Sequence, residues 1–248
     1  MAKRVLITGG GKRIGAALCR AFAEADWQVF IHVNKSLAEA EMLKNDLKNP
    51  SLHQITQCDF NDPAARQDWL KTLPPFDLII ANASCYRLTP RGGTECTENR
   101  QRYWQVNYQS TLELIEFQQK NLPEKLPAAA IIMLDCDVLT SDGGVKEFAE
   151  PPVGVDSYLA SRIALANQLP LLAKKLAPAL RLNAIAPGPV LPPVDCATKG
   201  MTIILEKVPM HQSVGVQEIV NSAIFLAENP SLTGAIIPVD GGMHLNSN

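Results

Sequence analysis

The sequence predicts an α/β fold, a doubly wound parallel sheet of about seven strands with helices on both faces. Two observations predict this class. Short apolar runs alternate with longer amphipathic stretches along the whole chain. The 248 residues, of which 46% are hydrophobic and 19% charged, suit one packed core rather than a disordered or fibrous chain. We therefore expect one domain over residues 1–248.

The individual elements follow from these two patterns. Apolar runs with the length of buried strands lie at Val5–Thr8, Val29–Val33, His53–Gln57, Leu78–Ala81, Ala130–Leu134, Leu182–Ile185 and Ala235–Val239. Helical periodicity is found at Ile14–Ala25, Leu37–Leu47, Ala64–Leu70, Arg100–Lys120, Tyr158–Leu176 and Val216–Leu226. Ligands of such sheets bind beyond the carboxyl ends of the strands, so the residues after each strand are the candidates for chemistry.

Three segments are expected to be irregular. Arg87–Thr97 and Leu139–Asp156 are predicted loops, and the second contains adjacent glycines and adjacent prolines. Pro189–Met210 follows a strand end and is expected to be a mobile loop that covers the substrate. The alternative for its apolar residues is a contact between subunits.

Composition excludes several classes of protein. A net charge of -2 gives no reason to expect a nucleic-acid partner. The first apolar run is too short for a signal sequence or a membrane span, so we expect a cytoplasmic protein. The six cysteines form no C-x-x-C pair and the four histidines lack metal-ligand spacing, so no metal site is expected.

A glycine-rich turn follows the first predicted strand and leads into a helix. Its sequence is Thr8-Gly9-Gly10-Gly11-Lys12-Arg13-Ile14-Gly15. Glycines let the backbone approach a pyrophosphate closely, and the helix amino terminus offers free N–H groups. The turn predicts a Rossmann-type dinucleotide site that uses Gly9, Gly11, Lys12, Arg13, Ile14 and Gly15. A plain glycine-rich turn is the alternative.

The end of the second strand indicates which dinucleotide binds. An NAD site usually places an acidic residue there, whereas this chain has His32-Val33-Asn34-Lys35-Ser36. Lys12, Arg13, Lys35 and Ser36 can surround a 2′-phosphate with cations and a hydroxyl group. NADP is therefore predicted, with Asn34 in the same site, and the alternative is that the lysines are only solvated surface residues.

Further landmarks appear in order along nearly the whole chain. After the glycine turn come Asp59, Asn82-Ala83-Ser84, Asn107, Tyr158, Pro187-Gly188 and Asp240-Gly241-Gly242. Together they resemble the short-chain dehydrogenase/reductase family. Within it, the Lys12-Arg13 pair, Asp135 after the fifth strand and Tyr86 make the chain most similar to pteridine reductases and dihydromonapterin reductases.

This resemblance implies roles for the residues that follow the strands. Asp59, with Phe60 beside it, would contact the adenine; Asn82, with Ala83 and Ser84, would lie beside the adenosine ribose; Pro187 and Gly188 would line the nicotinamide. A helix N-cap before Asp62-Pro63 is the alternative for Asp59. A structural turn residue is the alternative for Asn82.

Tyr158 is the expected proton donor, because hydride addition to C=O or C=N leaves a negative charge and a fixed cation can lower the pKa of a phenol. Arg162 lies one helical turn later, where the family usually has lysine. Arginine keeps the charge but does not deprotonate, so we expect retained cofactor binding with altered or slow turnover. A core aromatic is the alternative for Tyr158.

Two more residues complete the predicted catalytic set. Asp135 would orient Tyr158 or donate a proton to a ring nitrogen, with Asp137 as a competitor and a capping carboxylate as the alternative. Asn107 would kink its helix and anchor a water, and an ordinary surface amide is the alternative. The spacing from Asp135 to Tyr158 is longer than in most members of the family that the chain resembles, which implies an insertion of roughly ten residues within Leu139–Asp156.

The predicted function is NADPH-dependent reduction of a small heterocyclic C=N or C=O substrate, of the dihydropterin to tetrahydropterin type. Tyr86, Arg13 and Ser84 are the expected substrate contacts, with Tyr86 stacking the flat ring. The alternatives are an NADP-dependent ketoreductase acting on another carbonyl, and a catalytically weak NADP-binding sensor or scaffold. Family resemblance implies a homotetramer formed through the helices that carry Asn107 and Tyr158.

Overall fold

The computed structural model describes residues 2–86, 96–124, 127–147, 157–191, 202 and 204–246. Its centre is a seven-stranded sheet in the order β3-β2-β1-β4-β5-β6-β7, and every neighbouring pair is parallel. The strands are β1 (Arg4–Ile7), β2 (Gln28–Val33), β3 (Gln54–Gln57), β4 (Leu78–Ala81), β5 (Ala128–Met133), β6 (Leu180–Pro187) and β7 (Ile236–Val239). The predicted fold class is confirmed.

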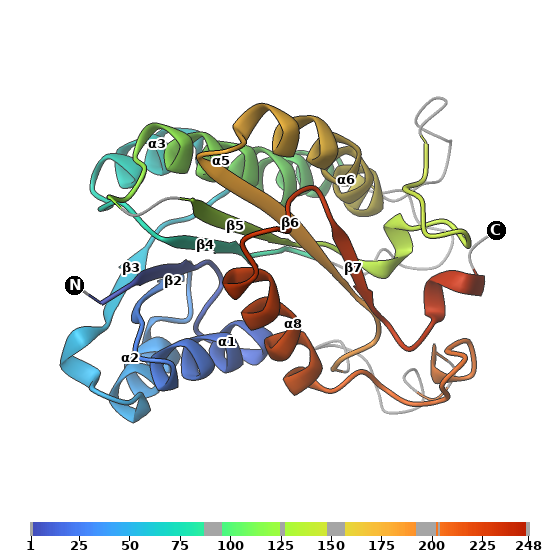
Figure 1. The fold of residues 1–248 in the computed structure, drawn as a ribbon, viewed down its shortest axis with the longest axis horizontal. Coiled ribbons are helices and arrows are strands. Elements are labelled where there is room, and N and C mark those ends of the chain that lie inside the picture. The colour runs from blue at the N-terminus through green and yellow to red at the C-terminus, as the bar shows by residue number, and fades with distance from the viewer. Residues whose placement is uncertain are drawn as a thin grey trace.

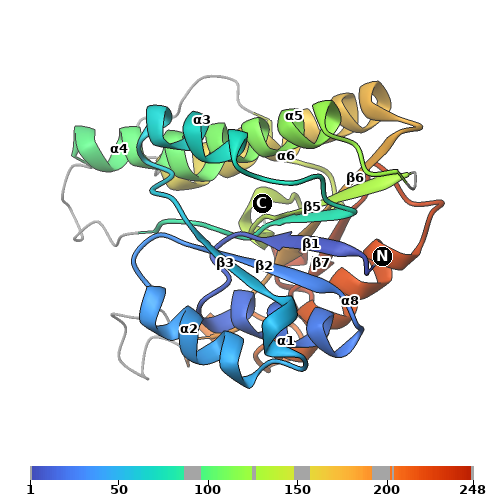
Figure 2. The ribbon, with the colours of Figure 1, turned by 90° about the vertical axis from the view of Figure 1, so that its left-hand side faces the viewer.

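Helices form a layer on each side of the sheet (Figures 1 and 2). One layer holds α1 (Arg13–Glu24), α2 (Leu37–Asp46) and α8 (Val216–Glu228). The other holds α3 (Pro63–Lys71), α4 (Thr97–Tyr103), α5 (Ser110–Lys120) and α6 (Ser157–Leu176). The short turns η1 (Pro50–Leu52), η3 (Cys136–Val138) and η4 (Met243–Asn246) are 3-10 helices. Among the described residues, no helix is long and apolar enough to cross a bilayer.

The strand order places the candidate site. The chain leaves β1 toward β2 on one side and returns to β4 on the other, so the connections after β1 and β4 diverge and open a crevice at their carboxyl ends. All six residues of β5 are buried, as expected for a central strand covered on both faces. The site is therefore built on rigid, buried strands.

The start of α3 settles the alternative for Asp59. The Asp62 side chain accepts hydrogen bonds from the N–H groups of Ala64 and Ala65, and Pro63 occupies the first turn. Asp62 is therefore the N-cap of α3, and the N-cap interpretation of Asp59 is wrong. The Asp59 carboxylate instead accepts from Asn61 N–H at 2.9 Å.

The predicted helix Arg100–Lys120 is interrupted. A π-helical segment, η2 (Trp104–Gln109), separates α4 from α5 and contains the buried Asn107. Asn107 Oδ1 accepts from Cys85 N–H at 2.9 Å, and its Nδ2 donates to Cys85 O at 3.1 Å. The surface-amide alternative for Asn107 is wrong, because the side chain is buried and bonds both backbone groups of Cys85, as a neighbouring strand would.

The three predicted irregular segments are only partly described. In the second of them, Leu139 pairs with Val145 in an antiparallel bridge around a turn. Most of Arg87–Thr97, the end of Leu139–Asp156 and the centre of Pro189–Met210 lie outside the described residues. The expected substrate-covering loop and the insertion therefore stay predictions.

Candidate functional site

The glycine turn is shaped by close backbone approach. Gly9 has φ +63°, a conformation that side chains disfavour. A Cβ on Gly15 would lie 2.1 Å from Gly9 O, so only glycine fits there. The N-cap residue of α1, Lys12, makes no side-chain cap. The first N–H groups of α1 are therefore not capped by that side chain, and a helix amino terminus of this kind can bind an anion.

Asn82 joins the end of β4 to this turn. Its Nδ2 donates to Thr8 O at 2.9 Å, and the N–H groups of Asn82 and Ala83 both donate to Thr8 Oγ1 at 2.9 Å. Asn82 therefore has the structural role that the sequence left open. It also lines the larger of the two cavities described below.

His32, in β2, forms a hydrogen bond with the glycine turn. Gly9 N–H donates to His32 Nδ1 at 3.4 Å, and His32 Nε2 donates to Cys58 O at 3.1 Å. The imidazole stacks on Phe60 with ring centroids 4.1 Å apart. Burial lowers the pKa of His32 from 6.5 to about 4, so the ring is neutral at pH 7. The sequence alone does not indicate this role of His32.

A cavity of about 350 Å³ lies over the carboxyl ends of β2 and β3. Nine predicted cofactor residues line it, namely Gly9, Lys12, Asn34, Lys35, Ser36, Asp59, Phe60, Ala83 and Ser84. Arg102 lines it as well, although its position in the predicted long helix gave no signal of this. Gly11 and Gly15 do not line it and instead form the turn itself.

Lys12 is engaged within the chain. Its Nζ lies 2.6 Å from Glu39 Oε1, and both side chains are about half exposed. This ion pair lowers the pKa of Glu39. Such an exposed pair is weak, so a phosphate group can compete for the lysine.

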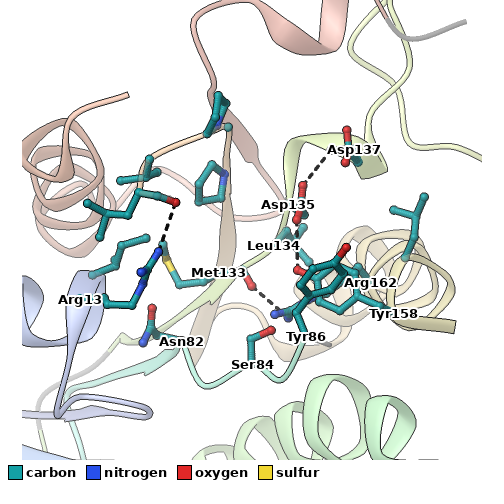
Figure 3. Close-up of a pocket in the computed structure, with 17 residues that line it drawn as sticks. Arg13, Asn82, Ser84, Tyr86, Met133, Leu134, Asp135, Asp137, Tyr158 and Arg162 are labelled. Carbon is teal, nitrogen blue, oxygen red and sulfur yellow. Dashed lines mark hydrogen bonds between the residues drawn. The ribbon is translucent and has the colours of Figure 1, made fainter. Parts of the chain in front are cut away.

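A larger cavity of about 690 Å³ adjoins the first and shares Ser84 with it (Figure 3). Ten predicted site residues line it, namely Arg13, Ile14, Asn82, Ser84, Tyr86, Asp135, Tyr158, Arg162, Pro187 and Gly188. Asp137, Met133 and Leu191 also line it. Residues from the ends of four strands, β1, β4, β5 and β6, and from α6 are thus gathered around one space.

The phenol and a carboxylate meet in this cavity. Tyr158 OH donates to Asp135 Oδ2 at 3.1 Å, and Asp135 Oδ1 accepts from Asp137 N–H at 3.2 Å (Figure 3). Asp135 therefore caps η3 and also accepts the hydrogen bond from Tyr158. The capping role and the position beside Tyr158 do not exclude each other.

Arg162 lies beneath the same phenol. Its guanidinium carbon is 5.6 Å from the Tyr158 ring centroid, and Nη1 donates to Met133 O at 3.1 Å. The side chain is 2% exposed, and its Nε has no hydrogen-bond partner in the described part of the chain. A buried, incompletely satisfied cation therefore stands at the cavity wall.

The pKa of Tyr158 contradicts the sequence-based expectation. Burial raises it to about 12; Arg162 lowers it, and Asp135 raises it further. We expected the fixed cation to bring the pKa toward neutrality, but loss of water around the phenol outweighs the cation in the free chain. The phenol of the free chain is therefore protonated at neutral pH.

The expected substrate contacts lie around Tyr158. Tyr86 is 49% exposed, and its ring meets the Tyr158 ring edge-on with centroids 4.8 Å apart. Arg13 has φ +53° and donates from Nη2 to Leu191 O at 3.2 Å. An exposed aromatic face and a cation thus border the cavity on different sides.

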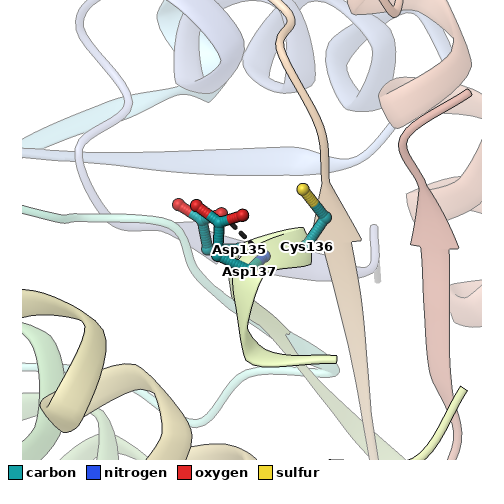
Figure 4. A group of neighbouring side chains, drawn as sticks. All are labelled: Asp135, Cys136 and Asp137. Atoms are coloured by element: carbon teal, nitrogen blue, oxygen red, sulfur yellow. Dashed lines mark hydrogen bonds between the residues drawn. The ribbon is translucent and has the colours of Figure 1, made fainter. Parts of the chain in front are cut away.

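Asp135, Cys136 and Asp137 form a compact group (Figure 4), with one potential ligand atom of each within 4.8 Å of the others. Burial and the adjacent carboxylates raise the pKa of the Cys136 thiol. Loss of water and the Asp135 charge raise the pKa of Asp137. The thiol is therefore protonated at neutral pH, and the two carboxylates lie beside it at the end of β5.

The residues present fit a phosphorylated dinucleotide. At Gly15, the backbone of Gly9 comes so close that there is no room for a Cβ. Cationic side chains and a serine line the smaller cavity, and the unpartnered Arg162 Nε lies at the wall of the larger one. An adenosine phosphate can therefore occupy the first space and a nicotinamide the second.

Comparison with known proteins agrees with this geometry. A family model described as "Enoyl-(Acyl carrier protein) reductase" matches residues 10–244. The dihydromonapterin reductase of Escherichia coli (strain SMS-3-5 / SECEC) is 29% identical over 245 residues, covering 97% of this chain and 96% of that protein. A dihydromonapterin reductase of Shigella flexneri has the same identity and coverage.

Solved structures are similar over the same length. FolM alternative dihydrofolate reductase 1 from Brucella canis, in complex with NADP, has a TM-score of 0.83 and 30% identity, covering 99% of this chain and 95% of that one. A Serratia marcescens short-chain dehydrogenase/reductase variant has a TM-score of 0.84 at 20% identity and covers 98% of each chain. The second likeness concerns the fold alone.

Proposed function

Because this chain belongs to the short-chain dehydrogenase/reductase family, we propose that it is an NADPH-dependent pteridine reductase that converts a dihydropterin to a tetrahydropterin. The observation that carries the proposal is the hydrogen bond of 3.1 Å between Tyr158 and Asp135 at the wall of the larger cavity. The names of the similar dihydromonapterin reductases and of the NADP-bound FolM structure support the same substrate class.

The smaller cavity and the glycine turn hold the cofactor. Gly9, Gly11, Ile14 and Gly15 shape the pyrophosphate site, while Lys12, Lys35 and Ser36, which line the smaller cavity, surround the 2′-phosphate. Arg13 lines the larger cavity instead. The remaining contacts come from Asn34, Asp59, Phe60, Asn82, Ala83, Ser84, Pro187 and Gly188. NADPH, when bound, supplies a hydride with its two electrons.

The chain itself supplies the proton. When C6 of the substrate takes up hydride, the electron pair of the N5=C6 bond moves to N5, and N5 receives the Tyr158 proton. The phenolate left behind lies next to the Arg162 guanidinium, which offsets its charge. Asp135 fixes the direction of the phenol, Asn107 holds the segment after β4, and water in the open cavity returns the proton.

The substrate ring lies between Tyr86 and the nicotinamide position. Tyr86 offers an exposed aromatic face, while Ser84 and Arg13 border the same space. Exclusion of water by the bound ring strengthens each charge interaction around Tyr158.

Oxidation of NADPH, followed by absorbance at 340 nm, tests the proposal with 7,8-dihydromonapterin, 7,8-dihydrobiopterin and an acetoacetyl thioester. We expect saturable activity with the pterins. Activity with the thioester alone would favour the ketoreductase alternative. Tight NADPH binding without turnover on any substrate would favour the sensor or scaffold.

We propose further that residues 1–248 form one domain and that the protein is a cytoplasmic homotetramer. Exposed apolar side chains on the relevant helices support the assembly: Trp104 lies in η2, and Leu171, on α6, is 72% exposed. Free thiols at the five described cysteines agree with a reducing compartment.

A further inference from the structure

We propose that Asp137 determines substrate specificity by binding the hydroxylated side chain that a dihydropterin carries on the carbon that receives hydride. This inference rests on the proposed pteridine reductase function and assigns a second carboxylate of the cavity to a task different from that of Asp135.

Asp137 is placed for such a contact. It lines the same 690 Å³ cavity as Tyr158, and one of its carboxylate oxygens lies within 4.8 Å of an oxygen of Asp135 (Figure 4). Figure 3 shows it beyond Asp135, on the side of the cavity away from Arg13. It follows β5 on the short turn η3, whose position is fixed by the cap from Asp135.

The two carboxylates differ in their partners. Asp135 accepts from Tyr158 OH and from Asp137 N–H, so both of its oxygens are engaged. The Asp137 side chain makes no hydrogen bond or ion pair with any residue that the structure describes. Its nearest opposite charges, Lys146 and Lys207, act only through space. Asp137 therefore has acceptor capacity to offer a ligand.

The chemistry of the substrate brings its side chain to this carboxylate. Reduction occurs at the N5=C6 bond, and the side chain is attached to C6. If Tyr158 protonates N5, the first side-chain carbon is only two bonds away from the protonated atom. Because Tyr158 is bonded to Asp135 and Asp137 lines the same cavity next to Asp135, the side-chain hydroxyl groups can reach the Asp137 carboxylate. Hydroxyl groups donate and carboxylates accept, so this pairing is favourable.

The same carboxylate disfavours dihydrofolate. That substrate carries an aryl amine without hydroxyl groups at this carbon, and its far end bears two carboxylates. Such a side chain offers the Asp137 carboxylate no hydroxyl donors, so the hydrogen bonds of the polyhydroxylated side chain are missing. The structure therefore favours a short polyhydroxylated side chain over a long anionic one.

The test compares kcat/KM for 7,8-dihydromonapterin, 6-methyl-7,8-dihydropterin and 7,8-dihydrofolate in the wild type and in Asp137→Asn. We expect the ratio of dihydromonapterin to 6-methyl-dihydropterin to fall by about 10-fold, mostly through KM, because one charged hydrogen bond is weakened. The relative activity with dihydrofolate should rise. Asp137→Glu, which keeps the charge, should retain part of the preference.

Asp68→Asn is the matched control, since Asp68 is an exposed carboxylate on α3 that lines neither cavity. NADPH titration by fluorescence shows whether each variant keeps its fold. An unchanged substrate ratio in both Asp137 variants would overturn the inference while leaving the reductase function in place. A wild type that binds NADPH but reduces no pterin would overturn the function itself, and the inference with it.

Discussion

Tyr158 is placed between a carboxylate that raises its pKa and a guanidinium that lowers it. If this phenol is the proton donor, Tyr158→Phe should lower kcat by about 10²- to 10⁴-fold. The Kd for NADPH should stay unchanged, because the hydroxyl group contacts Asp135 rather than the smaller cavity. Tyr108→Phe, which removes a hydroxyl bonded to Gln168, is the control. Retained turnover in Tyr158→Phe would remove Tyr158 from the mechanism.

Arg162 should contribute more to activity than to stability. Its described partner is the carbonyl of Met133, not a carboxylate, so burial of its charge is only partly offset. We expect Arg162→Met to keep or raise the melting temperature while kcat/KM falls by about 100-fold or more. Arg162→Lys should fall less, because an ammonium keeps the charge but cannot contact both Met133 O and the cavity. A strongly destabilised but active Arg162→Met would contradict this account.

Residues of the site were predictable from the sequence when a reactive side chain also followed a predicted strand or began a predicted helix. Tyr158, Asp135 and Ser84 follow strand ends or open a helix, and they meet in one cavity. His32 was not predictable in its role, because the sequence shows a histidine near a strand end but not the carbonyl and the glycine that it joins. The pKa of Tyr158 depends on burial, which the sequence does not show.

The π-helical segment η2 makes its own prediction at the scale of elements. Asn107→Ala would leave both Cys85 N–H and Cys85 O without their side-chain partner. We expect a loss of about 1–3 kcal/mol in the free energy of unfolding and weaker NADPH binding. Urea denaturation and cofactor titration measure these effects, with the exposed Asn121→Ala as control. Equal stability of the two variants would show that the Cys85 contacts are replaceable.

The turn after β1 should depend on pH through His32. Its pKa is about 4 in the folded chain, against 6.5 ordinarily, so between these values the unfolded chain binds a proton that the folded one does not. Stability should therefore fall as the pH drops through this window, by up to about 3 kcal/mol from this group. His32→Gln should show a smaller fall, whereas His211→Gln, at an exposed site, should match the wild type. Identical pH profiles for His32→Gln and the wild type would contradict the assignment.

Strands and helices were predicted to within a few residues because apolar spacing reflects burial directly. The family resemblance predicted a kink at Asn107, and η2 interrupts the helix there. The apolar spacing alone does not show this interruption, since one extra residue per turn barely changes the periodicity over so short a segment. The N-cap of α3 was only an alternative role for Asp59, and Asp62 takes it instead. Asp59 and Asp62 both precede the helix, and only the geometry shows which carboxylate reaches its N–H groups.

For the whole molecule, topology accounts for the location of the site. Seven parallel strands bring the turn after β1 beside the ends of β4, β5 and β6, so residues far apart in the chain line one cavity. The alternation of strands and helices was enough to predict that the site lies at the carboxyl ends of the strands. The separation into two adjoining cavities was not predictable, because it depends on side chains such as Arg102 and Leu191.

Assembly is the prediction that belongs to the whole molecule. A homotetramer should elute with four times the 27.0 kDa mass in light scattering. Leu171→Asp should shift the mass to a smaller species, because Leu171 exposes a large apolar side chain on α6. Arg20→Asp, at an exposed site on α1 in the other helix layer, is the charge control. A monomeric wild type would contradict the proposed assembly without affecting the chemistry.

Direct transfer of hydride to the pterin is the central claim, and isotope transfer measures it. With NADPH dideuterated at C4 of the nicotinamide and 7,8-dihydromonapterin as substrate, the account predicts tetrahydromonapterin that carries one deuterium, at C6. Mass spectrometry and NMR of the product would show it. Consumption of NADPH without label in the pterin, or no reduced pterin at all, would contradict the account.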